Sequence, residues 1–569
     1  MISPQRLRRF RISLILFALT AAALAWSAVR PAPGSGSSAS RPPNGIALAD
    51  VDPWGANFFL DLEVEAWSQQ KTVREARAAG IRWAKQMIPW YDVEPEQGDF
   101  RFDKYDRIID LYRAEGMEVI ARLDFPPAWV EPAPWAPQGK RGPPNNVPPA
   151  DFSLYATYVS RVVDHFGARV GHYQIWNEPN LTYEWGYGKA DPKAYARLLA
   201  AAASAARAVN PDVVILSAPM AINTETVDLV GNLSDLEYLR QLYDIGGFED
   251  SFDVLSVNAF GKSRPPEEAP AADRLNFQRM ALAHDIMETA GDGCKAVWAA
   301  EYGWNSAPEG IDSIWDRVSP EDQARYTLDG VSLAQSRWPW AGVFNLWYFR
   351  HCCQSPDEAV TYFQLLDAAF SPRRVYTALR EAAATRPTAT AGYWAERSAP
   401  VTLADSAAWL WKWDAPPGSR DCDRGPEDPS GTLDHRYLEN AHADARLSFS
   451  FRGTAAAVRV RRGPQAGTLT WRVDGRPGEQ RAALTGQPEW AWVILASGLD
   501  GREHTVDLGV GTAGGSVAID GYRVDTDAAA RSFGGWRTVG ALVLVFLAVL
   551  LVIDGRHVLG RLPRSKPSA

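Results

Sequence analysis

The sequence has few cysteines and no segment dominated by positive charge. Four cysteines occur in 569 residues and none forms a C-x-x-C pair, so a metal site built from cysteine is not expected. A disulfide between distant cysteines stays an open alternative. Asp and Glu outnumber Lys and Arg by 68 to 59, and no long basic run lies in the middle of the chain. Nucleic acid is therefore not an expected partner.

A glycine-rich phosphate loop is also lacking after the first apolar run, and this disfavours a doubly wound nucleotide-binding sheet. The length predicts two or three domains. Apolar residues make up 46% of the chain and charged residues 22%, which is an ordinary globular balance.

The N-terminus has the pattern of a segment that enters a membrane. Four arginines between positions 6 and 11 precede an apolar stretch at 12–29. This pattern predicts a signal anchor or a signal peptide over residues 1–30, and the length of the apolar stretch favours the anchor. A Pro/Gly/Ser-rich linker is expected at 31–50.

The C-terminus carries a second apolar segment. Residues 538–553 contain no charge, and a transmembrane helix is expected at 537–554, followed by a basic tail at 555–569. Positive charge flanks the outer side of both terminal segments. The positive-inside rule then places both tails in the cytoplasm, and everything between them on the extracytoplasmic side of the cell membrane. A buried core helix at the C-terminus is the alternative.

Between these segments, apolar runs alternate with helical patterns over residues 51–388. The alternation predicts a closed (β/α)8 barrel, and an open doubly wound sheet is the alternative. Asp191-Pro192, Ser319-Pro320 and Ser371-Pro372 each combine an N-cap residue with proline, which is typical of a helix start. The eight runs are GANFFLDL, IRWAKQMI, MEVIARLD, VGHYQIW, VVILSAP, FDVLSVNAF, KAVWAAEY and GVFNLWYF.

Residues 391–526 have a different character. Helical periodicity stops, and short alternating segments such as RLSFSFRG, AAVRVRRG and VAIDGYRV are separated by turn residues. This pattern predicts an accessory β-sandwich domain of jelly-roll type.

Two glutamates stand where a barrel places its chemistry, at the C-terminal ends of strands. Glu178, in IWNEPNL, follows the fourth run, and Glu301 ends the seventh. Strands four and seven lie across the barrel mouth, so the two carboxyl groups can face each other over a substrate. A pair of carboxyl groups, one acid and one nucleophile or base, is what glycoside hydrolysis requires.

With this pair in place, the chain resembles the retaining glycoside hydrolases whose catalytic glutamates lie on strands four and seven. The spelling WNEPN at 176–180 is most similar to glycoside hydrolase family 39, with the family 5 cellulases next. The resemblance covers the barrel and implies that Glu178 is the acid/base and Glu301 the nucleophile. Asn177 matches the residue that binds the sugar 2-hydroxyl.

The resemblance also implies several substrate-binding residues. Arg82 matches an arginine that supports the nucleophile, and Trp347 matches the aromatic floor under the sugar ring. Asn258 and Trp304 are further candidates for sugar contact. Where many relatives have histidine after strand three, this chain has Asp124, and Asn258 stands where His or Tyr is often seen. These departures put the sugar in doubt rather than the chemistry.

The function expected from the sequence is a membrane-anchored, extracytoplasmic glycosidase that cleaves an oligo- or polysaccharide by double displacement. No metal or organic cofactor is expected. Two alternatives use the same scaffold: a transglycosylase that remodels envelope glycan, and a carbohydrate-binding protein that has lost turnover.

Overall fold

The computed structural model describes residues 44–526, with gaps at 136–145, 225–230, 386, 404–407, 416–421, 423–427, 429, 441–444, 477–478 and 512–514. The predicted N-terminal anchor or signal peptide, most of the linker, the predicted transmembrane helix and the basic tail lie outside the described residues. No helix within the described part of the chain is apolar and long enough to span a membrane.

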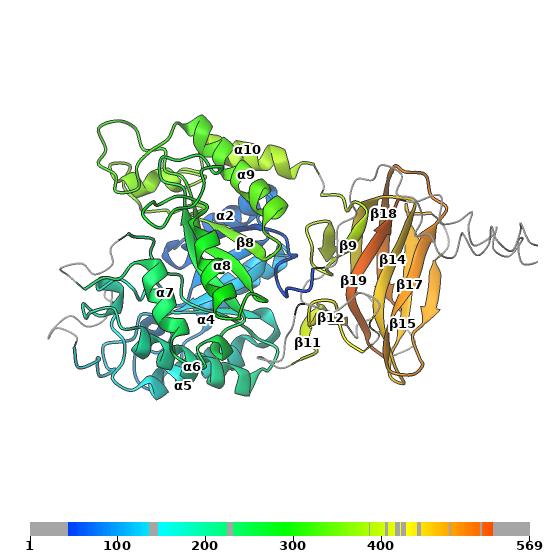
Figure 1. Cartoon of the computed structure of the whole chain (residues 1–569), viewed down its shortest axis with the longest axis horizontal. Coiled ribbons are helices and arrows are strands. Elements are labelled where there is room, and N and C mark those ends of the chain that lie inside the picture. Colours follow the sequence, from blue (N-terminus) through cyan, green and yellow to red (C-terminus); the bar gives the residue numbers. More distant parts are fainter. Residues whose placement is uncertain are drawn as a thin grey trace, which may run out of the picture.

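Eight parallel strands close into a barrel in sequence order, which confirms the (β/α)8 prediction (Figure 1). Each of the eight apolar runs contains one strand. The strands are β1 (Trp54–Phe58), β2 (Trp83–Met87), β3 (Glu118–Leu123), β4 (His172–Ile175), β5 (Val214–Leu216), β6 (Val254–Phe260), β7 (Ala296–Gly303) and β8 (Ala341–Leu346). Helices cover the outside of the barrel, so both faces of the strands are buried, as continuous apolar runs predict.

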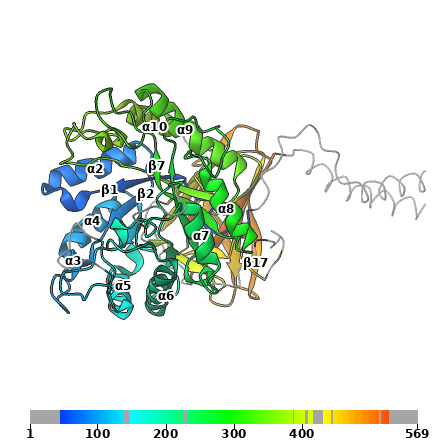
Figure 2. The ribbon, with the colours of Figure 1, turned by 60° about the vertical axis from the view of Figure 1, so that its left-hand side comes forward.

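The helices ring the strands on the side away from the barrel axis (Figure 2). They are α2 (Ala66–Ala78), α3 (Trp90–Val93), α4 (Asp103–Ala114), α5 (Phe152–Phe166), α6 (Pro192–Val209), α7 (Asp235–Tyr243), α8 (Arg279–Thr289), α9 (Pro320–Arg337) and α10 (Arg374–Ala383). Five short 3-10 helices also occur, at Leu60–Leu62, Gly167–Arg169, Tyr183–Trp185, Glu249–Ser251 and Ala359–Phe363.

Two of the three helix starts that were predicted from Ser/Asp-Pro pairs are confirmed. The side chain of Asp191 accepts a hydrogen bond at the start of α6, and that of Ser319 does so at the start of α9, each followed by proline at the first helical position. The third is wrong by two residues. Pro372 pairs with Leu366 in an isolated bridge, and α10 begins only at Arg374.

A β-sandwich follows the barrel, as predicted. One sheet has the order β10-β13-β18-β15-β16 and the other β11-β12-β19-β14-β17, with β9 paired to β19. The strands missed by sequence reasoning are short or lie near the barrel: β9 (Gly392–Trp394), β10 (Val401–Leu403), β11 (Leu410–Trp413), β12 (Arg436–Asn440) and β16 (Gln480–Ala483). The others are β13 (Arg446–Arg452), β14 (Ala455–Arg462), β15 (Thr468–Val473), β17 (Glu489–Ser497), β18 (Glu503–Val510) and β19 (Val517–Asp525).

The sandwich contacts the barrel at the N-terminal ends of the strands. Arg397 pairs with Glu118 at the start of β3, and Lys412 pairs with Asp212 just before β5 at 2.6 Å. Trp411 meets His172, the first residue of β4, with ring centroids 6.3 Å apart. The C-terminal ends of the strands, where barrel enzymes carry their chemistry, therefore face away from this junction.

A disulfide also crosses the junction. It joins Cys294, two residues before β7, to Cys422 in the sandwich and closes a loop of 128 residues. A disulfide that closes a long loop reduces the entropy of the unfolded chain and stabilises the fold.

We expect the double variant Cys294→Ala/Cys422→Ala to lose about 2–4 kcal/mol of free energy of unfolding, since the long loop is no longer closed. Urea unfolding followed by tryptophan fluorescence measures the loss. The double variant Cys352→Ala/Cys353→Ala is the control, because the disulfide between these neighbouring residues closes almost no loop. Equal losses in both variants would contradict the loop-entropy explanation.

Candidate active site

The segment after β4 holds its backbone in an unusual conformation. Trp176 and Glu178 both have positive φ angles, 71° and 41°, which residues other than glycine adopt rarely and mostly at functional sites. The buried Trp176 indole donates to the Glu184 carbonyl at 3.0 Å, and the Glu178 backbone N–H donates to the Pro219 carbonyl at 3.0 Å. These contacts hold the Glu178 side chain over the end of the barrel.

Asn180, the last residue of the WNEPN motif, has a structural role. Its amide nitrogen donates to the Ala221 and Leu233 carbonyls at 2.9 Å each, and its oxygen accepts from the Ala221 N–H at 2.8 Å. The side chain therefore joins the loop after β4 to the chain after β5. Its role is to position the loop that carries Glu178.

Glu178 and Glu301 meet at a single amide nitrogen. Asn258 Nδ2, on β6, donates to Glu178 Oε1 at 2.6 Å and lies 3.5 Å from Glu301 Oε2. Asn258 is also the register partner of Glu301 across the β6–β7 pair, next to a register shift at which β7 has one extra residue, Ala300. The structure thus brings together three of the residues that were predicted from the sequence.

The shared nitrogen limits how far apart the two carboxyl groups can be. Two atoms at 2.6 and 3.5 Å from the same nitrogen are at most about 6.1 Å from each other. Retaining glycosidases separate their carboxyl groups by about 5–5.5 Å and inverting ones by about 6.5–9.5 Å. The upper limit of about 6.1 Å between these two oxygens is therefore smaller than the carboxyl separation of inverting enzymes.

Burial is the largest cause that raises the pKa of both carboxyl groups. The pKa of Glu178 is well above its ordinary value, because burial disfavours its charge and the charges of Glu301 and Glu184 add to this. Burial also raises the pKa of Glu301, but Lys85 and Arg122 counteract the rise. Glu178 is therefore the group that keeps its proton while Glu301 ionises.

The two cations lie on neighbouring strands. Lys85, on β2, is buried and donates to the Ala300 carbonyl at 3.1 Å, one residue before Glu301. Its own pKa falls to about 8, because burial outweighs the attraction of Glu301. Arg122, on β3, contacts one oxygen of the fully buried Asp124, Oδ2, with both Nη2 at 2.6 Å and Nε at 2.7 Å. Asp124 thus orients a cation where many relatives have histidine.

Two further predicted residues lie beside these groups. Asn177 is buried, and its side-chain oxygen has no hydrogen-bond partner in the described part of the chain. Such an atom next to the acid suits a substrate hydroxyl. Trp347 follows β8, and its backbone N–H donates at 2.9 Å to the carbonyl of Tyr302, the neighbour of Glu301. Its ring meets the edge of Phe59 at 5.7 Å.

Two predicted residues do not reach the site. Arg82 precedes β2 at the opposite end of the barrel, where it lies 3.5 Å from Asp52 and lines a cavity against the sandwich. Trp304 is buried with 1% of its surface exposed, and its indole donates to the Arg264 carbonyl at 2.7 Å. A ring enclosed in this way has no face for a sugar. Both assignments are corrected here.

Sequence reasoning missed Lys85 and Arg122, and it noted Asp124 without its pairing to Arg122, although each carried a signal. Lys85 stands inside the apolar run IRWAKQMI, where a charge has no place unless it has a partner. Arg122 and Asp124 are two positions apart at the end of a strand, and residues with that spacing point to the same face.

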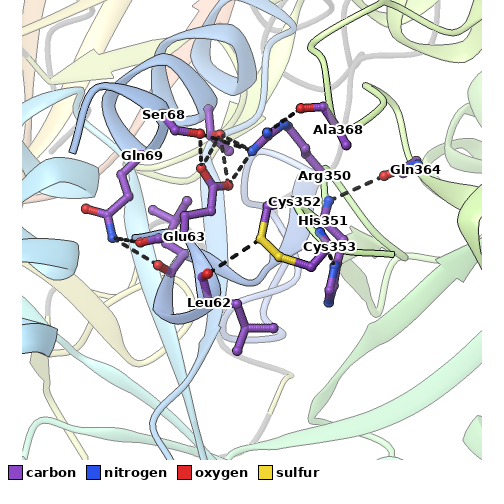
Figure 3. A network of polar contacts seen from close by, with 12 residues as sticks. Leu62, Glu63, Ser68, Gln69, Arg350, His351, Cys352, Cys353, Gln364 and Ala368 are labelled. Atoms are coloured by element: carbon purple, nitrogen blue, oxygen red, sulfur yellow. Dashed lines mark hydrogen bonds and ion pairs between the residues drawn. A yellow bond between two sulfur atoms is a disulfide. The ribbon is translucent and has the colours of Figure 1, made fainter. Parts of the chain in front are cut away.

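The loop after β8 is held by a buried ion pair (Figure 3). Arg350 contacts the Glu63 carboxylate at 2.7 Å and donates to the Ala368 carbonyl at 2.6 Å. Ser68 donates to the other oxygen of Glu63 at 2.6 Å. The adjacent residues Cys352 and Cys353 form a disulfide next to this pair. The network braces the segment that carries Trp347.

Comparison with known proteins finds glycoside hydrolases. The glycoside hydrolase 42 family model, described as beta-galactosidase, matches residues 61–133. A beta-xylosidase of Geobacillus stearothermophilus is 29% identical over 119 residues, which is 20% of this chain. The chain spans 23% of the length of that curated relative. These matches confirm the resemblance to glycoside hydrolases that the sequence predicted.

Similar folds occur among solved structures. A family 39 glycoside hydrolase from Bacteroides cellulosilyticus aligns with 17% identity and a TM-score of 0.46, covering 79% of this chain and 82% of the other. A beta-xylosidase from Caulobacter crescentus aligns with 14% identity and a TM-score of 0.44, covering 82% and 98%.

We expect Lys85→Met to raise the pKa of Glu301 and of Glu178. A cation favours the ionised form of a nearby carboxyl group, so its loss moves both titrations to higher pH. Carbon-13 NMR of labelled glutamate side chains measures both pKa values. Lys104→Met is the control, because Lys104 pairs with Asp92 on the outside of the barrel. Unchanged titrations in Lys85→Met would contradict the assignment.

Proposed function

We propose that this protein is a retaining glycoside hydrolase that acts on an oligo- or polysaccharide. The observation that carries the proposal is the meeting of Glu178 and Glu301, from the ends of β4 and β7, at the amide of Asn258. Like charges at such a distance cannot both ionise easily, and this separates the two groups into an acid and a nucleophile.

In the first step, a Glu301 carboxylate oxygen attacks the anomeric carbon. The bond from that carbon to the leaving oxygen breaks, and Glu178 transfers its proton to that oxygen. A covalent glycosyl-enzyme results. Glu301 loses its negative charge when the ester forms, and that charge had raised the pKa of Glu178. The pKa of Glu178 therefore falls during the step, and Glu178 ends the step ionised.

In the second step, ionised Glu178 removes a proton from water. The water oxygen bonds to the anomeric carbon, and the ester bond to Glu301 breaks. The configuration is inverted twice and therefore retained. The upper limit of about 6.1 Å between the two carboxyl oxygens supports this order of events, since it lies below the separation of about 6.5–9.5 Å in inverting enzymes.

The side chains around the pair supply binding. The unpartnered oxygen of Asn177 suits a sugar hydroxyl, and the Trp347 ring suits the apolar face of a pyranose. Lys85 and Arg122 hold the nucleophile ionised. Because similarity extends to a beta-xylosidase and to a family described as beta-galactosidase, aryl β-xylosides and β-galactosides are the first substrates to test.

We expect Glu301→Ala and Glu178→Ala to lose activity on the aryl glycoside that the purified full-length protein cleaves. The loss should be roughly 10³-fold or more for each variant, since one removes the nucleophile and the other the acid. Glu178→Ala should retain more activity on a dinitrophenyl glycoside, whose leaving group needs no proton. Initial rates by absorbance measure both effects.

The control for these variants is Glu96→Gln, which changes an exposed carboxylate outside the site. Proton NMR of the first product reads its anomeric configuration, and an inverted product would contradict double displacement. Glycan binding without turnover, equal in both glutamate variants, would support a binding protein instead. Products longer than the substrate would identify a transglycosylase.

We further propose that the protein is anchored in the cell membrane with its barrel on the extracytoplasmic side. The support is the pattern of two apolar segments, at 12–29 and 538–553, each flanked by positive charge.

The full-length protein should stay with membranes after an alkaline carbonate wash, and protease added to intact cells should digest the barrel. The fragment 45–530 should be released by the same wash, because it lacks both segments. Release of the full-length protein, or protection of the barrel from protease, would contradict the proposal.

A further inference from the structure

Three carboxyl groups meet where the sandwich faces the barrel, away from the proposed active site. They belong to Glu396, just after β9, Asp434, just before β12, and Asp520, on β19. One oxygen of each lies within 4.8 Å of the others, and all three residues are buried, with 1%, 5% and 0% of their surface exposed. Buried carboxylates this close repel one another strongly unless a cation lies among them.

The protein's own groups satisfy these carboxylates unequally. Asp520 accepts from Arg459 at 2.8 Å and from the Leu433 N–H at 2.9 Å. Among the described residues, Asp434 accepts a 3.2 Å bond from the Arg436 N–H. Neither oxygen of Glu396 has a hydrogen-bond partner within the described residues, although the side chain is almost completely buried. An unpartnered buried carboxylate aimed into an acidic cluster calls for a ligand.

We propose that Glu396, Asp434 and Asp520 bind a Ca²⁺ ion that fastens the sandwich to the barrel. Oxygens at the Ca²⁺ bonding distance of about 2.3–2.6 Å can be at most about 5 Å apart across the ion, and the three oxygens meet this limit. All donors are hard oxygen ligands, which disfavours zinc and copper. Mg²⁺ usually keeps several waters, which suits an enclosed carboxylate set poorly.

The position of Glu396 connects the ion to the junction. The preceding residue, Ala395, donates its N–H to Asp50 of the barrel segment at 2.8 Å. The following residue, Arg397, pairs with Glu118 at the start of β3. An ion held by Glu396 therefore holds the backbone from which two contacts to the barrel extend.

The test uses the purified full-length protein, stripped with EDTA and then dialysed against Ca²⁺ or Mg²⁺. We expect one equivalent of tightly bound Ca²⁺ per chain by elemental analysis, and a rise in the melting temperature of roughly 5 °C or more. Calcium removal should also speed hydrogen exchange of the peptide that contains residues 392–400, while the β6 peptide at 254–260 stays unchanged.

Glu396→Gln should bind Ca²⁺ at least tenfold more weakly and melt at the same temperature with and without the ion. The matched control is Glu489→Gln, an exposed carboxylate of the sandwich, which should bind like the unaltered protein. If Glu396→Gln does not fold, the same measurements on Asp434→Asn and the calcium content of the unaltered protein test the proposal. The proposal is overturned if the stripped protein takes up no Ca²⁺, if the ion persists in Glu396→Gln, or if Mg²⁺ alone is retained.

Discussion

The repulsion between two buried carboxylates governs the mouth of this barrel. Glu178 and Glu301 both approach one amide nitrogen, Asn258 Nδ2, at 2.6 and 3.5 Å. A protein stabilises such a pair by keeping a proton on one member and a cation near the other. Lys85 and Arg122 favour ionisation of Glu301, and burial with the charge of Glu184 favours the proton on Glu178. The acid and the nucleophile are distinguished by these neighbours rather than by their own chemistry.

The two ends of the barrel carry different tasks. At the N-terminal ends of the strands, the sandwich covers the barrel through Arg397, Lys412 and Trp411. At the C-terminal ends, loops held by Asn180 and by the Glu63–Arg350 pair leave the carboxyl groups within reach of a substrate. Because the sandwich lies at the far end, it does not border Glu178 and Glu301. A polysaccharide bound on the sandwich would have to pass around the barrel to reach Glu301.

Periodicity predicted the fold well, because buried parallel strands read as continuous apolar runs and all eight contained a strand. The two glutamates, Asn177 and Asn258 were placed correctly at strand ends, since this position follows from strand order alone. The prediction for Arg82 was wrong because this residue precedes β2. It therefore lies at the N-terminal end of the strand, opposite the end that carries the two glutamates. The prediction for Trp304 was wrong because its ring is enclosed by Phe277 and by Tyr326 of α9, which local patterns do not specify. Lys85 and Arg122 act on Glu301 because the closed barrel brings β2, β3 and β7 together. Local sequence patterns do not specify this arrangement.

Two clusters of buried acids in the described part of the chain have different neighbours, and these neighbours suit different roles. At the mouth, two carboxylates have two cations nearby, and Lys85 has a pKa near 8, so the charges can shift as a reaction proceeds. In the sandwich, Arg459 pairs with Asp520, the charge of Arg436 acts on Glu396 and Asp434, and Glu396 accepts no hydrogen bond among the described residues. Proton exchange suits the first arrangement, because a substrate enters and leaves there. The second is enclosed between sheet and barrel, where a permanently charged ion offsets the repulsion without any group having to change its state.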